Sequence, residues 1–489
     1  MADIGQAGVI VLLGTILSML SGFLFRLIGA RYLPTDQFGL VVLGISLVNI
    51  ASIPCILGLN QGVVRFIASE DDRFQNSYIT VSIITVLSFS IVAVAIGLIF
   101  KDTVNETIFG NSASDVLLFL FLITIPLFSL LKLITGILRG EMNSSGFVHI
   151  SKIIRPGMKL LLTIVAVFIF GTSTSVALAF FSAILITVFF GLYLIWYEGW
   201  RPQVDRSADF LSLYRFSFPL LISSSIFILL SYVDKMLIGA YQSPNSVAIY
   251  EVTVTIASLL GLFRSAFGFL LYPKLSEQIS SGNESIVGNM YKQTTKWILL
   301  LTTPAFVVLV FRPDFLIYIF GSEYSVSEIS PVLFLLSSGL FLNAIVGPNG
   351  EALLGFGRSR AVLIYNISAV AINIVLNIIL IPRFGLFGAA AASLIGYTIM
   401  NVLKSFDLYA YHQVSVISSK SILAAATIFI IGAVGIQILP EGIPLPLEVV
   451  ALSTIGIGSS IIGITILWII GGVSDEDHEL VNRLVAYVS

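Results

Sequence analysis

Long runs of apolar residues follow one another along almost the whole chain, separated by short polar connections. Each run is long enough for a helix that crosses a bilayer, which needs roughly 20 apolar residues. The period-two alternation of a transmembrane barrel is absent from these runs. The pattern predicts an all-α polytopic membrane protein with about 14 transmembrane helices. The predicted spans are 7–29, 38–60, 78–100, 116–138, 149–170, 174–197, 213–240, 246–271, 296–320, 329–352, 361–381, 386–406, 420–439 and 447–471.

Composition agrees with this class and narrows the function. Hydrophobic residues make up 57% of the chain and charged residues 11%, whereas soluble domains contain about 25% charged residues. The polar connections are too short for a catalytic domain outside the membrane, so we expect a protein that is not an enzyme. The single cysteine, Cys55, falls inside the second predicted span, where it cannot form a disulfide within the chain. The net charge of −2 says little by itself, and we expect no nucleic-acid partner.

Metal and cofactor chemistry find no support in the sequence. His149, His412 and His478 each stand alone, without the carboxylate or cysteine neighbours that a metal site needs. The glycine-rich stretch 347–351 lacks the Lys-Ser/Thr ending of a phosphate loop. We therefore expect no metal and no cofactor, and we interpret 347–351 as an irregular or kinked helix end.

The positions of Lys and Arg predict the orientation in the membrane, because positive residues are retained in short cytoplasmic loops. If the N-terminus lies in the cytoplasm, the Lys and Arg residues at cytoplasmic or boundary positions outnumber those at outer positions about fourfold. The outer positions are Arg31, Lys101, Arg312 and Arg383. Since the helix count is even, both termini are predicted to be cytoplasmic.

An internal repeat divides the chain. Residues 27–30, Leu-Ile-Gly-Ala, recur at 237–240, and a proline follows each copy at the same distance, at Pro34 and Pro244. Six predicted helices separate the copies, so both halves should run in the same sense, as parallel repeats of secondary transporters do. The repeat predicts two six-helix lobes in a parallel pseudo-repeat and two extra helices. Their bounds are 1–200 for helices 1–6, 211–410 for helices 7–12, and 411–489 for helices 13–14 and a cytoplasmic tail.

Ionisable residues inside spans are the candidate functional groups, because each is costly in lipid unless it faces water or a partner. Arg26 and Asp234 align to within two residues in the repeat, so a pair between the lobes is one interpretation. The other is that both snorkel to the outer headgroups. Glu251 is either a coupling group for Na⁺ or H⁺ or the salt-bridge partner of an arginine.

Arginines suit an anionic substrate, because the guanidinium fork matches phosphate oxygens. Arg264 lies within the eighth span among small residues. Together with Arg26 and Arg65 it could form an anion-binding ladder. Arg65 is equally well explained as an ordinary cytoplasmic-side cation.

Several stretches of the chain are similar to polysaccharide and oligosaccharide flippases, the polysaccharide transporter branch of the multidrug/oligosaccharidyl-lipid/polysaccharide exporters. They are residues 25–33 with 38–40, 62–68, 234–239 and 373–390. The resemblance covers nearly the whole chain. It implies the fold shared with multidrug antiporters (MATE-like) and lipid II flippases: two six-helix lobes around a cavity that opens alternately to either side.

The resemblance also implies a substrate and a mechanism. The substrate is a polyprenyl-phosphate-linked or pyrophosphate-linked oligosaccharide, moved from the inner to the outer leaflet of the cell membrane. In the lipid II relatives, arginines of helices one, two and eight are thought to hold the pyrophosphate, and Arg26, Arg65 and Arg264 stand in those helices here. Membrane lipid is then the other partner, and a monomer suffices.

Three alternatives remain at this point. The first is a drug or metabolite antiporter of the same fold, coupled to Na⁺ or H⁺, although a cavity for cationic drugs would favour acids over arginines. The second is a membrane glycan polymerase or ligase, which needs a larger outer loop. The third is a scaffold without transport activity.

Overall fold

The computed structural model describes residues 2–69, 72–141, 144–280, 284–414, 418–440 and 442–473, and this part of the chain is almost wholly helical. The tail from residue 474, predicted to be cytoplasmic, lies outside the described residues. The helices of the first part of the chain are α1 (Ala2–Tyr32), α2 (Thr35–Ile56), α3 (Leu59–Ser69), α4 (Asp72–Ile99), α5 (Lys101–Phe109), α6 (Asp115–Gly140), α7 (Ser144–Val148), the π-helical turn η1 (His149–Ile154), α8 (Arg155–Ile169), α9 (Ser173–Tyr197) and α10 (Phe210–Tyr241).

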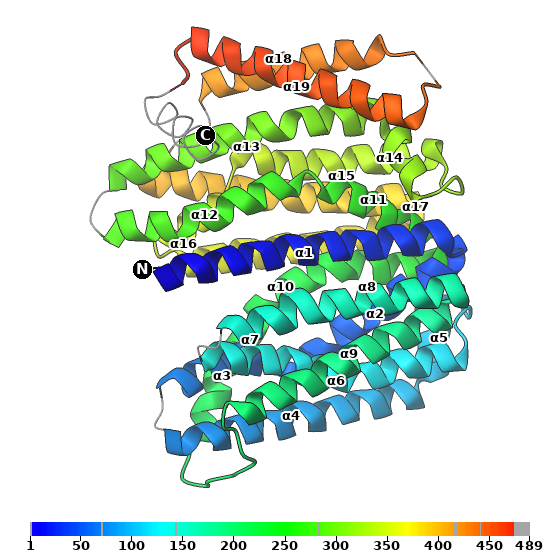
Figure 1. Ribbon diagram of the computed structural model, residues 1–489, viewed down its shortest axis with the longest axis vertical. Coiled ribbons are helices and arrows are strands. Elements are labelled where there is room, and N and C mark those ends of the chain that lie inside the picture. Colours follow the sequence, from blue (N-terminus) through cyan, green and yellow to red (C-terminus); the bar gives the residue numbers. More distant parts are fainter. Residues whose placement is uncertain are drawn as a thin grey trace. The chain divides into compact units, whose positions relative to one another are not determined.

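The remaining helices continue to the C-terminal part of the described chain (Figure 1). They are α11 (Pro244–Ser258), α12 (Gly261–Ser280), α13 (Glu284–Phe311), α14 (Pro313–Phe320), α15 (Val326–Val346), α16 (Asn349–Gly355), α17 (Ser359–His412), α18 (Ser419–Gln437) and α19 (Leu445–Ile469). Each predicted span coincides with helical structure. By length and apolarity, ten described helices qualify as spans, or up to eleven if the bent pair α11 and α12 counts as one. The all-α membrane class is thus confirmed, whereas the count of 14 stays a prediction.

Local signals in the sequence set where several helices begin and end. The Ser114 side chain accepts a hydrogen bond from the Leu117 amide at the start of α6, and Thr172 forms a capping box with Ser175 at the start of α9. The long α17 contains a break at Gly385, whose φ of 54° is unfavourable for any residue with a Cβ. This break separates the helices predicted over 361–381 and 386–406.

The chain forms two compact units. Unit 1 comprises Met1–Val252 and Asn377–Ala389, and unit 2 comprises Thr253–Leu376 and Ala390–Ser489. In unit 1, α6 is the central helix and packs against α2, α3, α4 and α9, the last two of which run beside it in Figure 1. In unit 2, α13 packs against α12, α15, α18 and α19. The lobe bounds predicted from the repeat stay a prediction.

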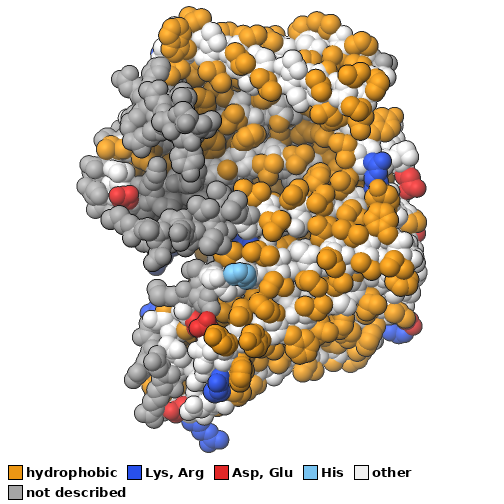
Figure 2. All heavy atoms as spheres, viewed as in Figure 1, with side chains coloured by type: hydrophobic (Ala, Val, Ile, Leu, Met, Phe, Trp, Pro, Cys, Tyr) orange, Lys and Arg blue, Asp and Glu red, His pale blue; other side chains and the backbone are white. Residues whose placement is uncertain are grey.

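The outer surface suits a lipid environment. Hydrophobic side chains cover most of the face shown in Figure 2, and the few charged side chains seen there lie near its edges. Inside the helices, hydroxyl groups donate to carbonyls one turn back, as Thr124 does to Leu120 and Thr187 to Ala183, both at 2.6 Å. These bonds satisfy polar groups that find no water in a bilayer.

Candidate functional site

A buried ion cluster in unit 1 joins α1, α10 and α11. The Glu251 carboxylate accepts from Arg26 Nε at 2.6 Å and lies 2.5 Å from Lys235 Nζ. The Glu251 and Lys235 side chains are only 5% and 6% exposed, whereas that of Arg26 is 38% exposed. Glu251 is thus the salt-bridge partner of an arginine, and its role in coupling to Na⁺ or H⁺ stays a prediction. Among the described residues, Arg26 makes its ion pair with Glu251 and not with Asp234.

Asp234 accepts hydrogen bonds from two neutral side chains. Its Oδ2 accepts from the Tyr250 hydroxyl at 2.9 Å, and its Oδ1 accepts from the Asn377 amide at 2.7 Å. The side chain is buried, so the hydrogen bonds compensate for the water it loses. Asp234 thus does not snorkel to the headgroups.

Two basic side chains of α8 lie near this cluster. Lys159 Nζ lies 3.4 Å from the centroid of the Phe25 ring, and its charged surroundings include the acid Glu251 as well as Arg26, Arg155 and Lys235. Arg155 precedes Lys159 by one helical turn, so both lie on the same face of α8. Lys159 is not among the residues predicted from the sequence, although a lysine four residues after an arginine in an apolar helix was the available signal.

Arg65 lies elsewhere in unit 1, in the wall of a cavity of about 810 Å³ that α2, α3, α6 and α10 enclose. The walls carry two more cations, Lys132 and Arg139 of α6, and we call this space the cationic cavity. Its lining includes no Asp or Glu among the described residues. The Arg65 guanidinium lies 4.6 Å from the centroid of the Phe216 ring. The remaining lining residues are Ile53, Ile56, Gly58, Asn60, Gln61, Val64, Ala68, Leu220, Leu221, Ser223, Ser224, Ser225, Phe227 and Ile228.

Glycines bring the walls of the cationic cavity close together. A Cβ at Gly62 of α3 would lie 1.8 Å from Ser217 Oγ of α10. On the other side, a Cβ at Gly136 of α6 would lie 2.3 Å from the Asn60 carbonyl oxygen. Gly136 stands between Lys132 and Arg139, so close packing of α3 on α6 fixes the backbone between the two cations.

Arg264 lies in unit 2, in α12. Its Nη2 contacts Glu351 Oε2 at 3.2 Å, and both side chains are about one-quarter to one-third exposed, at 27% and 30%. Its Nε is buried and has no hydrogen-bond partner among the described residues. A Cβ at Gly268, one turn after Arg264, would lie 3.3 Å from Glu351 Oε1, so glycine leaves room for the carboxylate.

The surroundings of Glu351 confirm the interpretation of 347–351. Gly347, with φ 63°, follows the end of α15, and α16 begins at Asn349. The stretch is thus an irregular junction between two helices. Lys404 of α17 approaches it, with Nζ 3.5 Å from the Cβ position at Gly350. Sequence reasoning missed Glu351 and Lys404 as neighbours of Arg264, because 87 residues separate Arg264 from Glu351.

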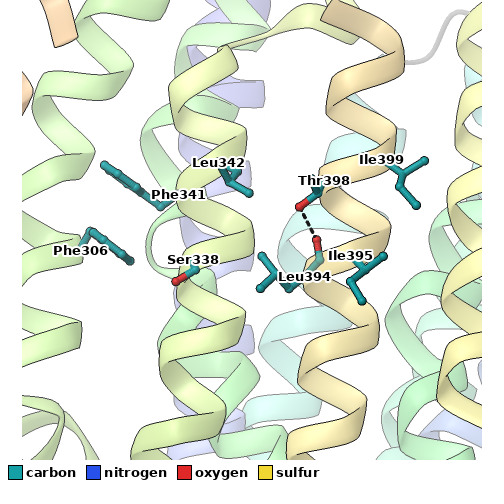
Figure 3. A pocket seen from close by; sticks show the side chains of 8 residues that line it. All are labelled: Phe306, Ser338, Phe341, Leu342, Leu394, Ile395, Thr398 and Ile399. Atoms are coloured by element: carbon teal, nitrogen blue, oxygen red, sulfur yellow. Dashed lines mark hydrogen bonds between the residues drawn. The ribbon is translucent and has the colours of Figure 1, made fainter. Parts of the chain in front are cut away.

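Two other cavities, both in unit 2, differ from the cationic cavity. The first, of about 950 Å³, contains Arg312, but that arginine pairs with Asp314 and Glu448. The second, of about 530 Å³, is almost wholly apolar (Figure 3). There the rings of Phe306 and Phe341 stack with centroids 4.2 Å apart, and the Thr398 hydroxyl donates to the Leu394 carbonyl within α17. Neither offers unpaired positive charge to an anion.

The five sequence-predicted site residues thus fall into three places. Arg26 and Glu251 meet in the buried cluster, with Asp234 next to Lys235 in the chain. Arg65 lines the cationic cavity, and Arg264 pairs with Glu351 in unit 2.

Comparison with known proteins decides the family. Residues 4–279, more than half of the chain, match the family described as polysaccharide biosynthesis protein. The chain belongs to this family. Residues 219–379 also match the MatE family. Both matches confirm the resemblance inferred from the sequence motifs.

Relatives and solved structures agree with this membership. The chain is 24% identical to the probable low-salt glycan biosynthesis flippase Agl15 of Haloferax volcanii over 82% of this chain and 84% of that protein. It is 27% identical to the putative O-antigen transporter of Shigella flexneri over 74% of this chain and 87% of that protein. Its fold is similar to that of the lipid II flippase MurJ in an inward closed conformation. There the TM-score is 0.76 at 15% identity, over 94% of this chain and 99% of that chain.

Proposed function

We propose that this protein is a flippase that moves a polyprenyl-phosphate-linked or pyrophosphate-linked oligosaccharide, or a polysaccharide repeat unit, from the cytoplasmic to the outer leaflet. It is a transporter rather than an enzyme, and it works by alternating access for the synthesis of surface glycan or glycoprotein. The observation that carries the proposal is the excess of cations inside apolar helices of unit 1. Such cations are expensive in lipid, and an anionic head group compensates them.

Arg26, Arg65 and Arg264 each bind phosphate oxygens in this proposal. Arg26 supports it because its Nε donates to Glu251, while among the described residues its Nη1 donates only to the Gly22 carbonyl, at 3.3 Å. Glu251 therefore orients the guanidinium and leaves donors for a ligand. In Arg264 the buried Nε is a donor without a partner among the described residues, and a phosphate oxygen would satisfy it.

Asp234 and Glu251 are proposed to couple transport to Na⁺ or H⁺. Burial supports the proposal, since both carboxylates lie inside helices that the bilayer surrounds. We further propose a monomer in the plasma membrane with both termini in the cytoplasm.

Arg264→Ala tests the function. The Arg264–Glu351 pair is partly exposed, so its loss should cost little stability. In cells whose own copy is deleted, we expect the variant to accumulate to normal abundance by immunoblot. Outer-surface glycan should fall at least tenfold while lipid-linked sugar accumulates in the inner leaflet. Arg264→Lys retains the charge and should keep part of the activity, and Arg360→Ala, at an exposed arginine of the same unit, is the matched control. Normal glycan delivery by Arg264→Ala would remove this residue from the mechanism.

The second candidate is a drug or metabolite antiporter coupled to Na⁺ or H⁺, which the MatE match over 219–379 favours. The same experiment separates the two functions. An antiporter predicts unchanged surface glycan on deletion of the whole gene.

A further inference from the structure

The cationic cavity holds a lysine that the proposed function does not use. Lys132 lies in α6, inside a predicted and observed span, and its Nζ donates to Ser52 Oγ at 3.1 Å and lies 4.7 Å from the Phe128 ring centroid. These two neutral contacts are its partners in the described part of the chain. A hydroxyl and a ring do not neutralise a charge at this depth.

Two other buried cations of the described chain pair with acids. Lys235 pairs with Glu251, and Arg312 pairs with Asp314 and Glu448. Lys132 instead experiences the charge of another cation, Arg155. A bilayer makes a lone cation costly, so its retention in a cavity wall indicates a ligand of opposite charge.

Arg139 extends the positive wall toward the end of α6. It follows Lys132 by seven residues, two helical turns, so both side chains leave the same face, roughly 10 Å apart along the axis. Arg139 Nη2 donates to the Asn60 carbonyl at 3.1 Å and to Gln61 Oε1 at 3.2 Å. These bonds fix the guanidinium and orient the Gln61 amide, whose NH₂ group remains a donor.

The dimensions of the cavity suit a charged sugar or a diphosphate. Its volume of about 810 Å³ falls within the range of roughly 300 to 1,000 Å³ typical of ligand sites. Cations stand both at depth, at Lys132, and near the helix end, at Arg139, with Arg65 on α3. The space is thus lined with positive charge over two helical turns.

We propose that the cationic cavity is an oxyanion-binding site of its own, in which Lys132 and Arg139 bind a phosphate or carboxylate group of the substrate head group. This inference rests on the proposed function for the identity of the substrate. It adds a site within unit 1 that is separate from Arg264. Two sources supply the same oxyanion chemistry: the phosphates of the lipid carrier and the carboxylate of an acidic sugar.

Binding to the purified full-length protein in lipid nanodiscs tests the site. Inorganic pyrophosphate and glucuronate are titrated separately by calorimetry at fixed ionic strength. For Lys132→Gln we expect the Kd of at least one of them to rise tenfold or more. Lys132→Arg should bind nearly as the native protein does. Lys101→Gln, which removes an exposed lysine paired with Asp115, is the matched control and should bind as the native protein does.

The outcomes distinguish the sources and the hypotheses. A loss confined to pyrophosphate supports the site and assigns it to the carrier phosphates, and a loss confined to glucuronate supports it and assigns it to an acidic sugar. Unchanged binding of both anions by Lys132→Gln, or an equal loss in Lys101→Gln, overturns the inference. If Lys132→Gln does not fold, Arg139→Gln, at the exposed end of the cavity, is titrated with the same two anions and judged by the same changes in Kd. The proposed function fails separately, by unchanged surface glycan on deletion of the whole gene.

Discussion

Glu251 is the residue whose removal should disturb unit 1 most. Its two carboxylate oxygens each meet a cation, Arg26 at 2.6 Å and Lys235 at 2.5 Å. Glu251→Gln preserves the size of the side chain and removes its charge. The change therefore leaves the two cations without their acid while packing is nearly unchanged.

The expected cost follows from the exposure of each partner. Lys235 is 6% exposed, and leaving a buried charge without its partner costs about 3–5 kcal/mol. Arg26 is 38% exposed and can be solvated, so its share is within about 1 kcal/mol. We expect Glu251→Gln to lower the free energy of unfolding by about 3–5 kcal/mol. The double variant Glu251→Gln/Lys235→Met removes the orphaned charge and should recover about half of this loss or more.

Equilibrium unfolding of the purified protein in mixed micelles, followed by tryptophan fluorescence, measures both variants. A double-mutant cycle with Lys235→Met alone isolates the coupling between the two residues. A loss below about 1 kcal/mol in Glu251→Gln would refute the reasoning. So would a double variant as unstable as the single one, because the penalty would then not come from the buried ammonium group.

Two further predictions concern packing and pH. Gly39→Ala should destabilise the protein by about 1–3 kcal/mol or more, because its Cβ would lie 1.8 Å from the Pro244 carbonyl oxygen. Gly157→Ala, with no atom within 4 Å, should be neutral or stabilising by up to about 1 kcal/mol. Equal melting temperatures of the Gly39→Ala and Gly157→Ala variants would contradict this contrast. Burial, with the charge of Glu198, raises the pKa of Glu141 from 4.5 to about 7. The folded state then binds the proton more tightly, so stability should fall as pH rises from about 4.5 to about 7. Glu141→Gln should lose this dependence in melting curves, and parallel curves for both proteins would argue against it.

Much of the fold could be predicted from the chain alone, because lipid imposes a length and a composition on every span. The stretches 78–100 and 174–197 contain no charged residue and lie within α4 with the residue after it and within α9. The irregular backbone at Gly347 was predicted for the same kind of reason, since glycine and proline in sequence disfavour a regular helix. The break at Gly385 was predicted only as a gap between spans.

For the candidate site, the sequence pointed to some of the residues but not to their pairings. Ionisable groups inside spans point to function, and Arg26, Asp234, Glu251 and Arg264 were found in this way. Which acid meets which base depends on contacts between helices, and Arg26 and Glu251 are 225 residues apart. The repeat suggested Asp234 as the partner of Arg26 because it places both residues at a similar depth in the membrane. A repeat carries no information on the direction in which each side chain points about its helix axis. Lys132 was missed because a single lysine barely lowers the hydropathy of the span that contains it.

The π-helical turn between α7 and α8 affects how this chain should be compared with others. Such a turn holds one residue more than an α-helical turn, and each residue of an α-helix advances by roughly 100°. If the residues of His149–Ile154 were counted as a regular α-helix, the positions of Arg155 and Lys159 about the helix axis would be wrong by roughly 100°. A homologue whose helix is regular there needs a one-residue gap in the alignment before its basic positions correspond to these two.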